Sequence, residues 1–161
     1  MSNTCFGRIR VKGTPNNVKL FKNALTKANS DCWLGRGFLV KKEEYENEKT
    51  VDFYGYCSNS FQSALFDDAE SMRKQKLSGN GYWEDGVYDI SEFLTVFEAC
   101  KRFNVNIEAY SIEPDNGFSE YLKYENGKTL KEVDVYVVAY KNTMEFLEEK
   151  DFTVKAPLSI K

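Results

Sequence analysis

The sequence predicts an α+β protein with a ferredoxin-like, split β-α-β antiparallel sheet that carries its helices on one face. Two observations support this prediction. Stretches in which apolar and polar residues alternate, as in half-buried strands, recur along the chain, and stretches with apolar residues at helical spacing lie between them. Their order is strand, helix, strand, helix, helix, strand, strand, strand. This order fits two α-β halves with extra elements inserted in the middle.

The chain length and composition favour a single folded domain over residues 1–161. The chain has 161 residues, 42% hydrophobic and 15% aromatic content, and a net charge of -3. That hydrophobic content exceeds what disordered chains carry. We expect residues 31–50 and 60–90 to be insertions and residues 153–161 to be a loose tail.

The first half begins with a strand over residues 5–12, followed by a helix. Gly13 ends the strand, Thr14 is placed to cap the helix, and Pro15 occupies its first position, where a missing N–H costs nothing. Apolar spacing extends this helix to about Ala28.

A hairpin and two helices are expected in the middle of the chain. Residues 38–40 begin the hairpin, residues 51–57 return, and the charged run of residues 41–49 forms a solvated tip. Ser60 is placed to cap a short helix, and Asp89 with Glu92 has the spacing of a capping box before a helix that runs to Phe103. These elements are followed by the second half.

The second half is an antiparallel meander. Alternation over residues 103–111 predicts a strand, the turn at residues 114–117 reverses the chain into a strand over residues 118–124, and the turn at residues 125–128 leads toward a strand over residues 133–140. The expected sheet therefore gains two strands from consecutive turns.

The residue types favour binding over catalysis. Histidine is absent and four cysteines, Cys5, Cys32, Cys57 and Cys100, are scattered without a close pair. The commonest general base and transition-metal ligand are therefore lacking, and we expect reduced, mostly buried thiols. We predict no catalytic residue, no metal and no cofactor. The lack of a long apolar run predicts no membrane span, and we expect a cytoplasmic protein.

Two segments resemble a known family. Ser2-Asn3-Thr4-Cys5 is followed by a strand, Gly13, Pro15 and a helix ending in Phe21, and this start resembles the YubB-type proteins of phages and plasmids. The stretch from Phe103 to Ile107, continued by Tyr110, Glu113, Pro114, Gly117, Phe118 and Gly127, is similar to that family's strand, turn and strand.

The resemblance covers about a third of the chain. It implies a ferredoxin-like fold and a mobile-element origin in a bacterial host cell, without an assigned chemistry. The tryptophan-rich stretch of that family is replaced here by residues 53–57 and by Tyr82-Trp83.

The leading functional hypothesis is a non-enzymatic accessory protein that engages a host protein and could inhibit a host defence system. Aromatic residues interleaved with acids, Tyr82, Trp83, Glu84, Asp85 and Tyr88, fit a protein-binding surface, because tyrosine and tryptophan dominate interface hot spots. The same residues would equally fit a lid on the core. The oligomeric state is left open.

Two alternatives remain. Strand parity places Arg8, Arg10, Tyr54, Tyr56 and Tyr110 on the sheet face away from the helices, where they could stack single-stranded nucleic acid, although a pI near 5.2 weighs against this. The third hypothesis is a magnesium or carboxylate-pair enzyme using acids whose simpler reading is a solvated helix face: Asp67, Asp68, Glu70, Glu84 and Asp85.

Overall fold

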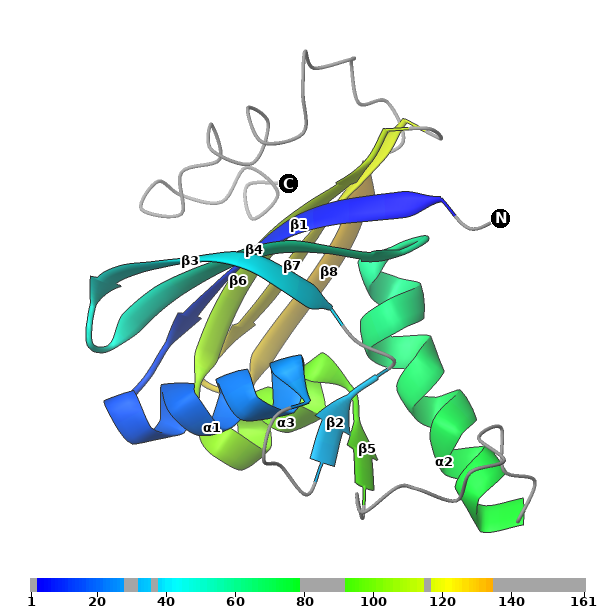
Figure 1. Ribbon diagram of the computed structural model, residues 1–161, viewed down its shortest axis with the longest axis horizontal. Helices are drawn as coiled ribbons and strands as arrows, with labels where there is room; N and C mark the ends of the chain where they lie inside the picture. Colours follow the sequence, from blue (N-terminus) through cyan, green and yellow to red (C-terminus); the bar gives the residue numbers. More distant parts are fainter. Residues whose placement is uncertain (1–2, 28–31, 36–37, 79–91, 115–116, 135–161) are drawn as a thin grey trace.

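One antiparallel sheet dominates the structure. The computed structural model describes residues 3–27, 32–35, 38–78, 92–114 and 117–134. Six strands pair in the order β3-β4-β1-β6-β7-β8, so β1 lies inside the sheet (Figure 1). The strands are β1 (Thr4–Lys12), β3 (Leu39–Asn47), β4 (Thr50–Ser58), β6 (Asn106–Glu113), β7 (Phe118–Glu125) and β8 (Lys128–Asp134). The α+β class is confirmed.

Two helices pack side by side on one face of this sheet. They are α1 (Pro15–Thr26) and α3 (Val96–Phe103) (Figure 1). A π-helical turn, η1 (Ser63–Asp67), continues directly into α2 (Asp68–Ser78), and a separate two-stranded parallel sheet joins β2 (Cys32–Leu34) to β5 (Glu92–Leu94). Strand β2 was not expected from the sequence.

The alternation of the strands produces one main core. Odd-numbered residues of β1, β4 and β6 meet the apolar faces of α1 and α3, and the contacts form one cluster. Side chains from each contributor are fully or almost fully buried: Ile9, Val11, Phe21, Leu25, Val51, Phe53, Val96, Ala99, Ile107 and Ala109. The predicted division of these strands into a helix-facing side and an opposite side is therefore observed.

Helix ends follow the local capping signals. The hydroxyl of Thr14 accepts a hydrogen bond from the backbone N–H of Asn17 at 3.2 Å, as expected for a cap. Thr95 and Glu98 form a complete capping box at the start of α3. The predicted box at Asp89 and Glu92 is wrong for this helix, because Glu92 lies in β5 and Asp89 lies outside the described residues.

The charged run of residues 41–49 is largely strand, which corrects the predicted solvated tip. Residues 41–47 belong to β3 and pair with β4, so only residues 48 and 49 form the turn. An edge strand satisfies its backbone through one neighbour while exposing its side chains, and charged residues are common there. Composition alone could not separate this edge strand from a loop.

Two further boundaries differ from the sequence prediction. The strand expected from Phe103 begins at Asn106, because Phe103 ends α3 and Asn104 adopts the left-handed conformation at its C-cap. β8 begins at Lys128, immediately after the turn, rather than near Val133, and residues 135–140 lie outside the described part.

Adjacent residues of α1 provide a test of the packing. Phe21 is fully buried whereas Leu20 is 40% exposed. We expect Phe21→Ala to lower the free energy of unfolding by about 3–5 kcal/mol, since it removes a buried ring and leaves a cavity. Leu20→Ala should cost less than about 1 kcal/mol. Urea denaturation of both variants checks this, and equal losses would contradict the packing of α1.

Candidate functional site

The sheet face away from α1 and α3 carries a cluster that we name the tyrosine–arginine face. It consists of Arg8, Arg10, Asp52, Tyr54, Glu108, Tyr110 and Tyr121. The strand register aligns these residues in two rows. Tyr54 lies opposite Arg8, which lies opposite Tyr110, which lies opposite Tyr121. In the second row, Asp52 lies opposite Arg10, which lies opposite Glu108.

One carboxylate holds both arginines. Asp52 accepts hydrogen bonds from Nε and Nη2 of Arg10 at 2.7 and 2.9 Å and from Nη2 of Arg8 at 2.9 Å. All three residues are at most 9% exposed. Burial by itself would raise the pKa of Asp52, but the hydrogen bonds from Arg10 and Arg8 outweigh it and hold that pKa below its usual value.

The tyrosines form an aromatic layer beside these charges. The rings of Tyr110 and Tyr121 lie 4.7 Å apart, and the hydroxyl of Tyr121 donates a hydrogen bond to Glu108 at 2.9 Å. Burial raises the pKa of Tyr110 to about 12. Burial and then the hydrogen bond to Glu108 raise the pKa of Tyr121 further. Both hydroxyls therefore stay protonated at neutral pH.

Four of the five residues of the nucleic-acid hypothesis belong to the tyrosine–arginine face, and Tyr56 lies beyond it in β4, opposite Phe6. Arg8, Arg10, Tyr54 and Tyr110 are at most 9% exposed, whereas Tyr56 is half-buried. Base stacking needs accessible rings, so four of these side chains offer little surface for it. Their role in binding nucleic acid stays a prediction.

Three members of the face were missed from the sequence: Asp52, Glu108 and Tyr121. Glu108 has the same parity as Tyr110 in its strand. Asp52 has the same parity as Tyr54 and Tyr56 in its strand, so alternation alone places it beside the arginines. Tyr121 pairs with Tyr110 across β6 and β7, which required the register between the two strands. Strand parity was therefore sufficient to place Asp52 and Glu108 on the face, but not Tyr121.

The protein-binding residues of the leading hypothesis lie outside the described residues. They are Tyr82, Trp83, Glu84, Asp85 and Tyr88. The acids of the enzyme hypothesis are divided: Asp67, Asp68 and Glu70 lie on the helical stretch after β4, and Asp67 and Glu70 are exposed. In the described part of the chain, no cluster of three or more cysteine or acidic side chains could hold a metal ion.

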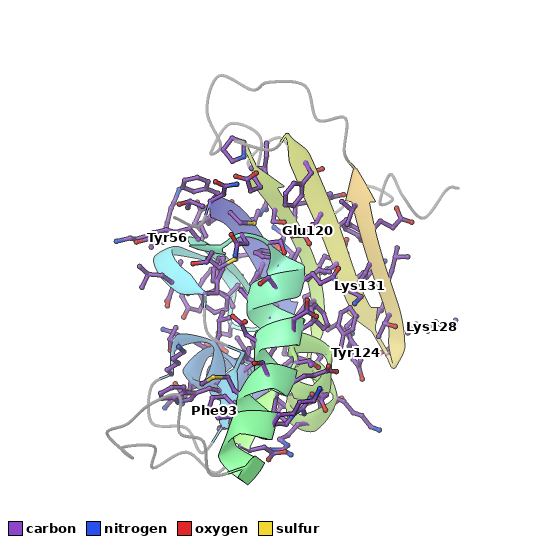
Figure 2. All side chains as sticks on the ribbon, turned by 90° about the vertical axis from the view of Figure 1, so that its right-hand side faces the viewer. Tyr56, Phe93, Glu120, Tyr124, Lys128 and Lys131 are labelled. Atoms are coloured by element: carbon purple, nitrogen blue, oxygen red, sulfur yellow. The ribbon has the colours of Figure 1, made fainter. Side chains whose placement is uncertain are left out.

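A second buried polar group lies on the helix-bearing face. Glu120 of β7, labelled in Figure 2, is this group. It accepts hydrogen bonds from the backbone N–H groups of Phe61 and Gln62 at 2.7 and 3.3 Å, and from the Ser111 hydroxyl at 3.0 Å. An anionic group at this place suits the start of a helix, where N–H groups lack helical partners. Glu120 thus fixes the helical stretch to the sheet.

All four thiols of the chain are buried. All four cysteines are free, which confirms the expected reduced thiols, and Cys5 lies directly opposite Cys57 in the register of β1 and β4. A hydrogen bond with Cys5, followed by burial, raises the pKa of Cys57, and burial raises the pKa of Cys100. A thiol needs its thiolate form to act as a nucleophile, so neither group is activated.

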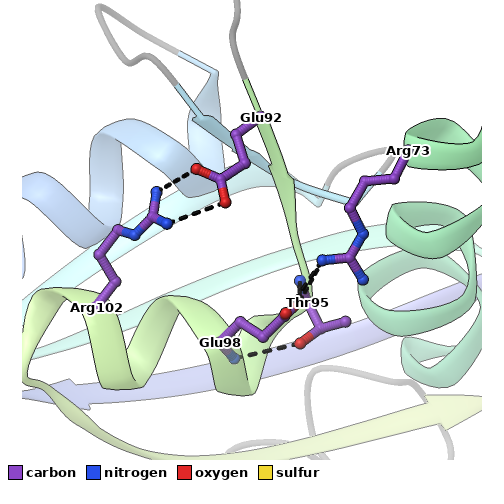
Figure 3. A network of polar contacts seen from close by, with 5 residues as sticks. All are labelled: Arg73, Glu92, Thr95, Glu98 and Arg102. Atoms are coloured by element: carbon purple, nitrogen blue, oxygen red, sulfur yellow. Dashed lines mark hydrogen bonds and ion pairs between the residues drawn. The ribbon is translucent and has the colours of Figure 1, made fainter. Parts of the chain in front are cut away.

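A surface network ties α2 and β5 to α3. Arg73 of α2 bonds Glu98 at 2.9 Å, and Arg102 of α3 bonds both oxygens of Glu92 at 2.6 and 3.0 Å (Figure 3). Glu98 also accepts the backbone N–H of Thr95. These pairs are exposed, so each adds little stability. These ion pairs hold α2 and β5 against α3.

Open space near the sheet occurs mainly at strand ends. A cleft of about 350 Å³ lies between the C-terminal end of α1 and the start of β3, and its lining includes Lys27, Leu39 and Tyr56. No helix in the described residues is long and apolar enough to cross a membrane.

Comparisons with known proteins identify no relative. No protein-family model, curated protein or solved structure matches the chain.

Asp52 offers a test of this charged cluster. We expect Asp52→Asn to lower the free energy of unfolding at neutral pH by about 3 kcal/mol, because two buried guanidinium groups lose their carboxylate. Glu44→Gln, at a neighbouring exposed acid with a Lys42 partner, should cost less than about 1 kcal/mol.

The pH dependence follows from the lowered pKa. Asp52 contributes its full share to the free energy of unfolding above its pKa in the unfolded chain, which is about 3.9. This stabilisation is lost as the pH falls through the lower pKa of the folded protein. The difference between wild type and Asp52→Asn, measured by urea denaturation, should therefore persist to about pH 4 and shrink below it. A difference that vanished between pH 7 and 5 would refute the lowered pKa.

Proposed function

We propose that this chain is a non-enzymatic binding protein of phage or mobile-element origin that engages a host protein. The observation that supports binding over catalysis is the mutual neutralisation of the tyrosine–arginine face. Asp52 accepts hydrogen bonds from Arg8 and Arg10, and Tyr121 donates one to Glu108. General acids and bases work best with a pKa near the working pH, and the shifts at Asp52, Tyr110 and Tyr121 all lead away from neutrality.

A ferredoxin-like arrangement is part of this proposal. Strands β1 and β3 run in the same direction with β4 between them, and α1 connects the two. Strands β4 and β6 likewise share a direction with β1 between them. Two interleaved units of this kind are what a split β-α-β sheet requires. Strands β7 and β8 would then extend that sheet.

The mobile-element origin rests on the resemblance to the YubB-type proteins. Several of its residues fall on described structure: Thr4 and Cys5 open β1, Pro15 opens α1, and Phe118 opens β7, while Ser2 lies outside the described residues. A protein of this class would act in the cytoplasm of a bacterial host, and blocking a defence system is one role open to it. The proposed contact surface is Tyr82 to Tyr88.

A specific observation favours single-stranded nucleic-acid binding as the second candidate. Lys41 lies 5.7 Å from the ring centre of Tyr56, and Lys42 lies 5.2 Å from that of Tyr54. A basic surface beside an accessible aromatic ring is a feature that single-stranded nucleic-acid sites use, and Tyr56 is the more exposed of these two rings. This surface includes exposed lysines, unlike the buried centre of the face.

The variant Trp83→Ala tests the leading proposal. Affinity capture from a bacterial host lysate should retain a defined host protein with wild type and lose at least 90% of it with Trp83→Ala, because interface tryptophans carry much of the binding energy. Tyr45→Ala is the matched control, since Tyr45 is an aromatic side chain elsewhere that is 58% exposed. Circular dichroism verifies that both variants fold.

Nucleic-acid binding is distinguished by fluorescence anisotropy with short single-stranded RNA and DNA. Affinity that falls steeply with salt and weakens in Lys41→Ala/Lys42→Ala would establish the second candidate and displace the first. Capture that is equal in wild type and Trp83→Ala would remove Tyr82 to Tyr88 as the contact surface.

A further inference from the structure

The outer edge of β8 has a regular, exposed geometry. In the described part of the chain, β8 pairs only with β7, and it forms the end of the sheet (Figure 2). Lys128, Thr129 and Lys131 are exposed, and Val133 is 54% exposed. The pairing of β7 with β8 has no register shift, whereas the opposite edge strand, β3, has two. Irregular pairing protects β3 from further pairing more than it protects β8.

The hairpin turn fixes which backbone groups of β8 point outward. Asn126 and Gly127 both have positive φ, 50° and 87°, as a two-residue type I′ turn requires. In such a hairpin the flanking residues Glu125 and Lys128 form a hydrogen-bonded pair, and such pairs recur at every second residue. The N–H and C=O groups of Leu130 and Glu132 therefore point toward β7. Those of Thr129, Lys131 and Val133 point away from it.

The sequence of β8 is self-complementary in one antiparallel register. When Leu130 lies opposite Leu130 of a second copy, Lys128 lies opposite Glu132 of that copy, and Glu132 lies opposite its Lys128. Thr129 then pairs with Lys131, so the outward backbone groups meet. Shifting the register to centre on Lys131 or on Glu132 would place like charges opposite each other.

The side chains on the tyrosine–arginine side of β8 agree with this register. Leu130 packs beside Tyr54, Tyr110 and Tyr121 as a partly buried neighbour of that cluster. A hollow of about 400 Å³ at the hairpin end is lined by Lys123, Lys128 and Leu130, among others. An opposing Glu132 carboxylate would lie beside Lys128 at this hollow, where Glu125 already pairs with Lys123 at 3.1 Å.

We propose that the β8 edge binds a second copy of this chain, forming a twofold-symmetric dimer whose two sheets join at Leu130. The dimer places Lys128 of each copy opposite Glu132 of the other and pairs the outward backbone groups of Thr129 and Lys131. Self-association of this kind is independent of the proposed host partner. The interface is an addition of strand to strand, which relies on main-chain hydrogen bonds for affinity.

A charge-reversal cycle tests this register. Sedimentation equilibrium over a concentration series should show a dimer for wild type. Lys128→Glu and Glu132→Lys should each weaken the dimer roughly tenfold or more, because both symmetric pairs become like-charged. The double variant Lys128→Glu/Glu132→Lys should regain dimerisation, since it exchanges the charges without changing their complementarity. Thermal unfolding verifies that each variant folds.

Hydrogen exchange gives a second, independent readout. The amides of Thr129 and Lys131 should become protected as the concentration rises through the dimerisation range, whereas those of Leu130 and Glu132 should be protected throughout. A chain that stays monomeric at all concentrations would overturn the proposal. So would protection of Thr129 and Lys131 in the monomer, which would mean that another part of the same chain covers the edge. A dimer indifferent to the charge cycle would also overturn it.

Discussion

The burial of β1 on both faces is the constraint on which the rest of the structure depends. Its odd residues, such as Ile9 and Val11, face the helices, and its even residues Arg8 and Arg10 are almost as deeply buried. A buried guanidinium requires a carboxylate, because an unpaired charge in this setting is costly. Asp52 of β4 meets that requirement for both arginines at once. One acidic residue therefore allows the arginines of the tyrosine–arginine face to be buried.

The pairing of these buried charges also bears on function. The charges on this face pair with one another, and the pKa values of Asp52, Tyr110 and Tyr121 all shift away from neutrality. Recognition would then fall to the periphery, where β3 and β8 expose lysines, Leu39 and Val133. The two edges differ in kind, since the irregular β3 carries cation–aromatic contacts and the regular β8 carries a self-complementary charge pattern.

Periodicity predicted much of the fold because it reports burial. The parity of β1, β4 and β6, the helix after Pro15 and the strand after Gly117 follow from residues close in sequence. The strand character of the charged run at residues 41–47 depends on pairing with β4, which local composition does not encode. For the candidate site, parity predicted that the arginines and tyrosines share a face. Their burial and their common partner Asp52 depend on tertiary contacts, and alternation cannot report them.

The most direct test of the central claim is an NMR pH titration that follows the Asp52 carboxyl carbon and the Cys57 thiol. If the buried polar groups are structural, the pKa of Asp52 lies below about 3.9 and Cys57 stays protonated through neutral pH. Titration of Asp52 or ionisation of Cys57 between pH 5 and 8 would contradict the account. It would place a group suited to acid–base or nucleophilic chemistry inside this sheet.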